Sequence, residues 1–110
     1  MDNFQENKML SKEEIIDAVV MLNSNTLDQE QTNDLFHRIS DSIKPFVTQT
    51  LSENYNSLLS ECADELFQEV NMALWKNLHS FDPKKGNFFT FIRPLVLRAA
   101  QEYENKVFNA

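Results

Sequence analysis

The stretch from Ser80 to Phe91 reads SFDPKKGNFFTF, and the turn-forming and aromatic residues of the chain concentrate in it. It holds the only glycine, one of three prolines, two adjacent lysines and four of nine phenylalanines. The Asp-Pro pair favours a turn because proline presets its own φ, and Gly86 can adopt the positive φ that closes a helix connection. Taken alone, the stretch is best explained as a connector between two packed helices, with Phe81 and Phe88 in the core.

Apolar residues recur at steps of three and four on both sides of this connector, which is the spacing of one face of a helix. The helix before it is predicted over about residues 57–79. Its apolar stripe consists of Leu59, Ala63, Leu66, Val70, Ala73 and Leu74. The stripe of the helix after the connector consists of Phe88, Ile92, Leu95, Ala99 and Tyr103.

Two more helices are predicted earlier in the chain. Ser11 and Glu14 have the spacing of a capping box, a hydroxyl cap followed three residues later by a carboxylate, and they begin a short helix that ends near Asn23. Thr26 and Gln29 repeat this signature ahead of a longer helical pattern.

Pro45 lies inside this longer pattern and should kink the helix or split it, because proline lacks the N–H that closes a helical turn. No segment of comparable length alternates with the period of two that a strand requires. We therefore predict an all-α fold, a compact bundle of three to four main helices, with residues 1–10 as a flexible tail and residues 11–110 as a single domain.

The net charge of −7 would normally argue against nucleic acid as a partner. The charge is unevenly distributed, however, since residues 1–60 hold ten acidic and four basic residues and residues 61–110 hold seven and six. The second half could therefore still form a local basic patch. The single cysteine and the absence of a run of about 20 apolar residues favour a reduced, cytoplasmic protein with no membrane contact.

The helix before the connector carries a face unlike an ordinary solvated surface. Opposite its apolar stripe, Met72 and Trp75 lie beside the polar side chains of Glu65, Gln68 and Glu69. Large apolar groups surrounded by charge are typical of protein-binding surfaces, because they supply contact area while the carboxylates select a basic partner. Scattered exposed apolar residues are common as well, so a solvated face remains the alternative.

The helix after the connector carries the ingredients of nucleic-acid binding. Gln101 faces outward and is flanked by Arg93 and Arg98, so that amides able to reach base edges lie between cations able to reach phosphates. At the start of this helix, Phe91 follows the lysine pair closely, and an exposed aromatic ring can stack on an unpaired base. The alternatives are a solvated helix and a set of phenylalanines that all pack into the core.

The ordered set of motifs between Asp64 and Tyr103, DELFQEVNMALWKNLHSFDPKKGNFFTFIRPLVLRAAQEY, resembles the region 2 domain of bacterial RNA polymerase sigma factors. Within that family it is most similar to the small extracytoplasmic-function group. The matching elements are the Gln-Glu run near Glu69, the Leu-Trp-Lys triplet ending at Lys76, the Phe-Asp-Pro-x-x-Gly connector and the Phe-x-Thr-Phe that ends at Phe91.

The resemblance implies two binding surfaces and no enzymatic activity, metal or cofactor. The expected partners are the clamp coiled coil of core RNA polymerase and promoter DNA at the −10 element, with an anti-sigma factor or a second sigma-domain chain as further candidates. The expected polymerase-binding residues are Glu65, Gln68, Glu69, Met72 and Trp75. The expected DNA-binding residues are Lys84, Lys85, Asn87, Phe91, Arg93, Arg98 and Gln101.

The sequence also departs from the family pattern. Pro94 replaces a frequently basic position, Glu102 and Glu104 reduce the positive charge expected near phosphates, and the sequence ends before the second domain of a sigma factor. A fragment, a split subunit and a degenerate relative all fit these departures. The alternative function is therefore a sigma-like helical module that binds a protein partner without reading DNA.

Overall fold

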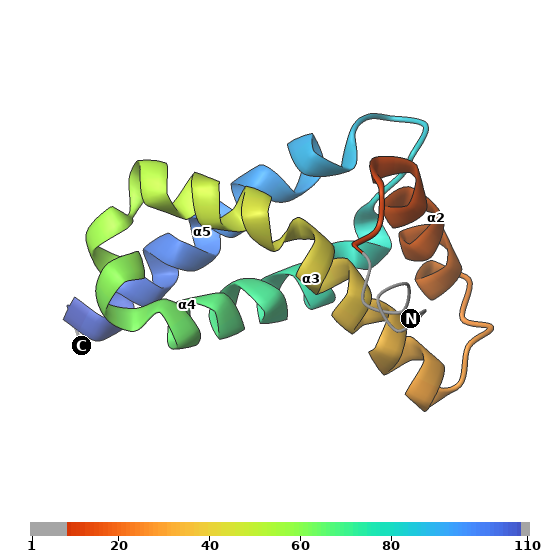
Figure 1. Cartoon of the computed structure of the whole chain (residues 1–110), viewed down its shortest axis with the longest axis horizontal. Helices are drawn as coiled ribbons and strands as arrows, with labels where there is room; N and C mark the ends of the chain where they lie inside the picture. Colours follow the sequence, from red (N-terminus) through yellow and green to blue (C-terminus); the bar gives the residue numbers. More distant parts are fainter. Residues whose placement is uncertain (1–8, 109–110) are drawn as a thin grey trace, which may run out of the picture. The chain divides into compact units, whose positions relative to one another are not determined.

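The structure is a computed structural model that describes residues 9–108. Within this range the chain forms α2 (Lys12–Asn23), α3 (Gln29–Asn54), α4 (Asn56–Asn77), the short 3₁₀ helix η1 (Leu78–Ser80) and α5 (Phe88–Phe108), and no strand (Figure 1). Four α-helices confirm the predicted all-α class. No helix in the described residues is long and apolar enough to cross a membrane.

The chain divides into two compact units, the first ending at Lys44 and the second beginning at Pro45, inside α3. The single domain predicted for residues 11–110 stays a prediction. The predicted tail falls mainly on residues 1–8, which lie outside the described residues. Its last residue, Leu10, donates its N–H to Oγ of Ser42 at 2.8 Å.

The capping box predicted for the first helix is present in the first unit. Oγ of Ser11 accepts from the Glu14 N–H at 3.2 Å, and Oε1 of Glu14 accepts from the Ser11 N–H at 2.8 Å. The two bonds satisfy donors that the helix itself leaves unpaired. The helix ends at Asn23, as predicted.

The cap predicted for the next helix at Thr26 and Gln29 is wrong. The reciprocal bonds are formed two residues later, where the Gln31 N–H donates to Oδ1 of Asp28 at 2.8 Å and the Asp28 N–H donates to Oε1 of Gln31 at 3.1 Å. Thr26 instead shares a hydroxyl hydrogen bond of 2.8 Å with Ser24. Both pairs have the spacing of a capping box, but α3 begins at Gln29, directly after Asp28, so only the second pair flanks the start of the helix.

The helical stripes are interrupted in a place that the sequence did not indicate. α3 is not split at Pro45, whereas Cys62 inside α4 has non-helical dihedral angles, φ −133° and ψ 40°. This break shifts the register of the stripe, so Leu58 is buried and the predicted Leu59 is only half-buried.

In the second unit, α4 and α5 run antiparallel beside each other, joined by the connector (Figure 1). The α4 stripe is confirmed at Leu66, Val70 and Leu74, which are buried. The buried residues of α5 are Phe88, Ile92, Val96, Ala99 and Ala100. The predicted Leu95 and Tyr103 are only half-buried, since Val96 and Ala100 take the central positions of this face.

The connector forms the tight turn that its composition predicted. Asp82 organises it, because its carbonyl oxygen accepts from the Lys85 N–H at 3.0 Å and its Oδ1 accepts from the Lys84 N–H at 2.9 Å. Gly86 follows with a φ of 158°, a backbone conformation that residues with a Cβ rarely adopt. The helix α5 begins two residues after Gly86, at Phe88.

Replacing Gly86 with alanine should lower the free energy of unfolding by about 1 kcal/mol or more, because the φ of 158° is strained for any L-residue even where space is available. Urea unfolding followed by circular dichroism measures this change. Lys85→Ala, at the neighbouring exposed position, is the matched control and should stay within about 0.5 kcal/mol of the parent. Equal effects of the two substitutions would contradict the backbone explanation.

Candidate functional site

The predicted polymerase-binding residues lie together on one face of α4. Glu65, Gln68, Met72 and Trp75 follow one another at steps of three and four, opposite the buried stripe of the same helix, and Glu69 flanks them on the side of α5. Met72 is 53% exposed and Trp75 is 45% exposed, although both are large apolar residues. We call these five residues the α4 face.

The end of α5 lies against the carboxylates of the α4 face. Nζ of Lys106 is 3.6 Å from Oε2 of Glu69, whose side chain is 31% exposed. The pKa of Tyr103 is raised above its usual value of 10.0, first by desolvation, then by a hydrogen bond with Cys62 and by the nearby charges of Glu65 and Glu69. Local sequence patterns do not predict these contacts, because they join residues at least 34 positions apart.

The phenylalanines of the connector form a ring cluster at the start of α5. Phe88 is 2% exposed, and its ring centroid lies 5.1 Å from that of Phe81, which is 8% exposed. Both residues are therefore in the core, as predicted. Phe89 packs on Phe46 with a centroid separation of 5.0 Å.

Phe91 occupies the edge of this cluster. Its ring centroid is 5.3 Å from that of Phe81 and 6.2 Å from that of Phe88, yet the residue stays only half-buried. The buried rings fix the position of Phe91 while part of its surface remains accessible. An aromatic ring held in this way loses little conformational entropy when a second ring stacks on it.

The remaining predicted DNA-binding residues are exposed but do not share one face. Lys84 and Lys85 lie in the connector, whereas Arg93 and Arg98 are five residues apart on α5 and so point about 140° away from each other. Gln101 is exposed on the outer side of the same helix.

Asn87 has a structural role in addition to its predicted contact with DNA. Its Oδ1 accepts from the Phe89 N–H at 2.7 Å and from the Thr90 N–H at 3.3 Å, so it caps the first turn of α5.

Pro94 is the seventh residue of α5. Proline is tolerated in the first turn of a helix, but Pro94 lies beyond that turn. It therefore leaves the Thr90 carbonyl without its helical donor.

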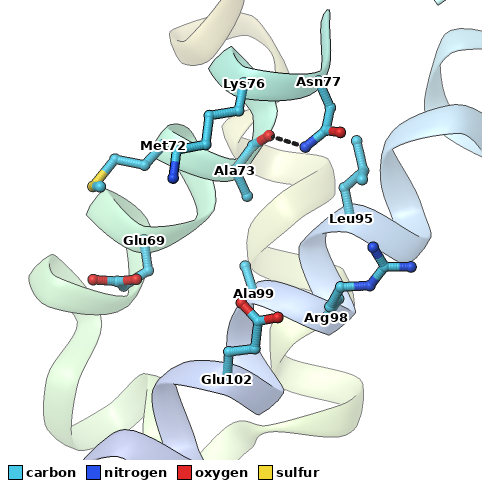
Figure 2. A pocket seen from close by; sticks show the side chains of 9 residues that line it. All are labelled: Glu69, Met72, Ala73, Lys76, Asn77, Leu95, Arg98, Ala99 and Glu102. Carbon is cyan, nitrogen blue, oxygen red and sulfur yellow. Dashed lines mark hydrogen bonds between the residues drawn. The ribbon is translucent and has the colours of Figure 1, made fainter. Parts of the chain in front are cut away.

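A groove of about 220 Å³ runs between α4 and α5 beside the α4 face (Figure 2). Its lining residues are Glu69, Met72, Ala73, Lys76, Asn77, Leu95, Arg98, Ala99 and Glu102. Glu69 and Met72 belong to the predicted polymerase-binding set and Arg98 to the predicted DNA-binding set, so the two predicted surfaces meet in this groove. Among residues 9–108, no group of three His, Cys, Asp or Glu residues is arranged to hold a metal ion.

These features define a helical binding domain with a carboxylate-bearing face and an aromatic, basic turn. Residues 44–106 match the family model of Sigma-70 region 2, which is more than half of the 110 residues. The chain therefore belongs to the sigma-70 region 2 family, as the motifs of the sequence predicted. No curated protein and no solved structure matches the chain significantly.

Membership of this family establishes the general role of the matched residues. The domain is a non-enzymatic transcription initiation domain, with a sigma-type role in binding core RNA polymerase and in recognising the promoter −10 element. The match covers most of the second compact unit, up to residue 106, and leaves residues 9–43 outside it. The extracytoplasmic-function group and the individual contact residues stay predictions.

Proposed function

We propose that the chain binds core RNA polymerase through the α4 face and engages the separated strand of the −10 element through the connector and α5. The observation that carries this proposal is the placement of Glu65, Gln68, Glu69, Met72 and Trp75 on one exposed face of the matched domain. The aromatic and basic connector lies at the end of the same helix pair. The helix pair α4 and α5 thus presents both surfaces.

The α4 face suits a basic helical partner such as the clamp coiled coil. Met72 and Trp75 supply apolar contact area, and exposed apolar anchors surrounded by polar groups dominate the energy of protein interfaces. Glu65 and Glu69 provide negative charge that selects a partner carrying arginine or lysine. An anti-sigma factor or a second sigma-domain chain with the same chemistry would compete for this face.

The connector and α5 suit an unpaired DNA strand. Phe91 offers a positioned aromatic surface on which a base can stack, without any covalent chemistry. Lys84, Lys85 and Arg98 are exposed cations that can neutralise phosphates, while the amide of Gln101 can reach a base edge. Stacking and charge together would hold the strand open once it has separated.

Phe91→Ala should weaken binding of a single-stranded −10-like oligonucleotide by about 1–3 kcal/mol, because it removes the stacking surface for one base. Arg98→Ala should weaken binding less and should lower the dependence of log K on log salt by about 0.7, the value for one phosphate contact on a single strand. Fluorescence anisotropy at several salt concentrations, with core polymerase present, measures both effects.

Arg38→Ala is the matched control, since Arg38 is an exposed arginine outside the matched residues, and it should leave the affinity for DNA unchanged. If neither Phe91→Ala nor Arg98→Ala weakens binding, the DNA half of the proposal fails.

The second candidate function is a sigma-like module that binds a protein partner without reading DNA. The acidic side chains of Glu102 and Glu104 on α5 and the net charge of −7 favour it. It predicts no salt-dependent affinity for DNA, whereas a domain that neutralises several phosphates loses affinity steeply as salt rises. The same anisotropy titration therefore separates the two functions.

A further inference from the structure

The carboxylate of Glu69 already has a cation of this chain beside it. Nζ of Lys106, in the last turn of α5, lies 3.6 Å from Oε2 of Glu69. Glu69 belongs to the α4 face, the surface proposed to bind core polymerase through its negative charge. Lys106 and a cation of the polymerase would therefore meet the same carboxylate, and only one of them can hold it closely.

The contact between Lys106 and Glu69 is loose. Its length of 3.6 Å exceeds the upper limit of about 3.2 Å for a well-formed N–H···O hydrogen bond. The side chain of Lys106 is 64% exposed, so its ammonium group stays largely hydrated. An exposed pair of this kind contributes little, because solvent screens the charges and holding both side chains costs entropy. A cation that bonds more closely to Glu69 can therefore displace Lys106.

Packing nevertheless keeps the end of α5 beside Glu69. Tyr103 precedes Lys106 by three residues, about one helical turn, and its side chain hydrogen bonds with Cys62 of α4. This contact joins the last turns of α5 to the helix that carries Glu69. Lys106 is therefore held near Glu69 in the free chain by the packing of the two helices, and not by the ion pair alone.

Lys106 also has a second carboxylate nearby on its own helix. Glu102 precedes it by four residues, the spacing at which a glutamate and a following lysine attract each other along a helix. Glu102 lines the same groove as Glu69, from the α5 side (Figure 2). Loss of Glu69 to a partner would thus leave Lys106 with another carboxylate, so its displacement costs little.

We propose that Lys106 occupies the partner's position on Glu69 in the free chain, and that an arginine of core polymerase displaces it on binding. The inference rests on the proposed function, and it adds a selectivity step to the α4 face. An arginine guanidinium can form two parallel bonds with a carboxylate, whereas a lysine ammonium acts as a point charge. Lys106 thereby discriminates against basic partners that offer Glu69 only a lysine.

The test measures the affinity of core polymerase for the full chain carrying Lys106→Gln, Glu69→Gln or both. Lys106→Gln should bind core polymerase about 2- to 5-fold more tightly than the parent, a gain of the size of an exposed ion pair. In the Glu69→Gln background the same substitution should have no effect, because the carboxylate for which the two cations compete is gone. The double-mutant cycle isolates this coupling from any general effect of charge.

Two further variants serve as controls. Lys106→Arg keeps the charge and holds Glu69 at least as well as lysine does, so the affinity for core polymerase should not rise. Lys76→Gln also removes a lysine charge beside the α4 face, but Lys76 lies seven residues from Glu69. It should change the affinity by the same factor with Glu69 and with Glu69→Gln. Circular dichroism checks that each variant keeps its helical content.

An unchanged or lower affinity of Lys106→Gln would overturn the inference, and so would an equal gain in the Glu69→Gln background. A gain in Lys106→Arg that matches the gain in Lys106→Gln would overturn it as well, since the charge of residue 106 would then be irrelevant. Failure of the proposed function gives a different result. Glu69→Gln by itself would then leave polymerase binding unchanged, and the inference would fall with the function on which it rests.

Discussion

Charge reversal of Glu69 to lysine is expected to abolish detectable binding of core RNA polymerase, a loss of about 100-fold or more. Glu69 lies on the edge of the α4 face that borders α5, three residues before Met72, and its side chain is 31% exposed. Placing a cation there against a basic partner replaces an attraction with a repulsion, and like charges at an interface cost several kcal/mol. Pull-down and biolayer interferometry with purified core polymerase measure the loss.

Glu104→Lys is the matched control for this experiment. It makes the same change of charge on α5, away from the α4 face, and should leave polymerase binding within about twofold of the parent. Glu69→Lys also breaks the pair with Lys106, but an exposed ion pair contributes only about 0–1 kcal/mol, so the domain should stay folded. Unchanged polymerase binding in a folded Glu69→Lys variant would refute the assignment of the α4 face.

The second large effect is expected from Phe88→Ala, which should lower the free energy of unfolding by about 3–5 kcal/mol. The ring of Phe88 is 2% exposed and contacts the rings of Phe81, Phe89 and Phe91. Its removal leaves a cavity at the junction of the connector and α5. A loss of this size is a large fraction of the stability of a small domain, about 5–15 kcal/mol, and is measured by chemical or thermal unfolding.

Phe88→Leu preserves most of the buried volume and should cost considerably less than Phe88→Ala. Phe91→Ala should also cost less stability, because the ring is half-buried, although it should weaken DNA binding more than any other change in the cluster. Similar stability losses in Phe88→Ala and Phe91→Ala would contradict the division of the cluster into a buried and a DNA-facing part.

The sequence by itself determined the elements that depend on neighbouring residues. The capping box of Ser11 and Glu14, the turn that ends at Gly86 and the buried positions of Phe81 and Phe88 all follow from local propensity and helical periodicity. The α4 face was predictable for the same reason, since its residues lie within one regular stretch of helix. The family followed from motifs whose order and spacing are properties of the sequence.

Only the tertiary structure decided which residues of different helices meet. The bend at Cys62 moved burial from Leu59 to Leu58, and packing between α4 and α5 placed Val96 in the core instead of Leu95. It also brought residues of both helices, among them Met72 and Leu95, into the lining of one groove. Periodicity gives the face of a helix on which a residue lies, but the side chain opposite depends on the depth, rotation and offset of packing between segments far apart in the sequence. The groove therefore emerged only from the fold.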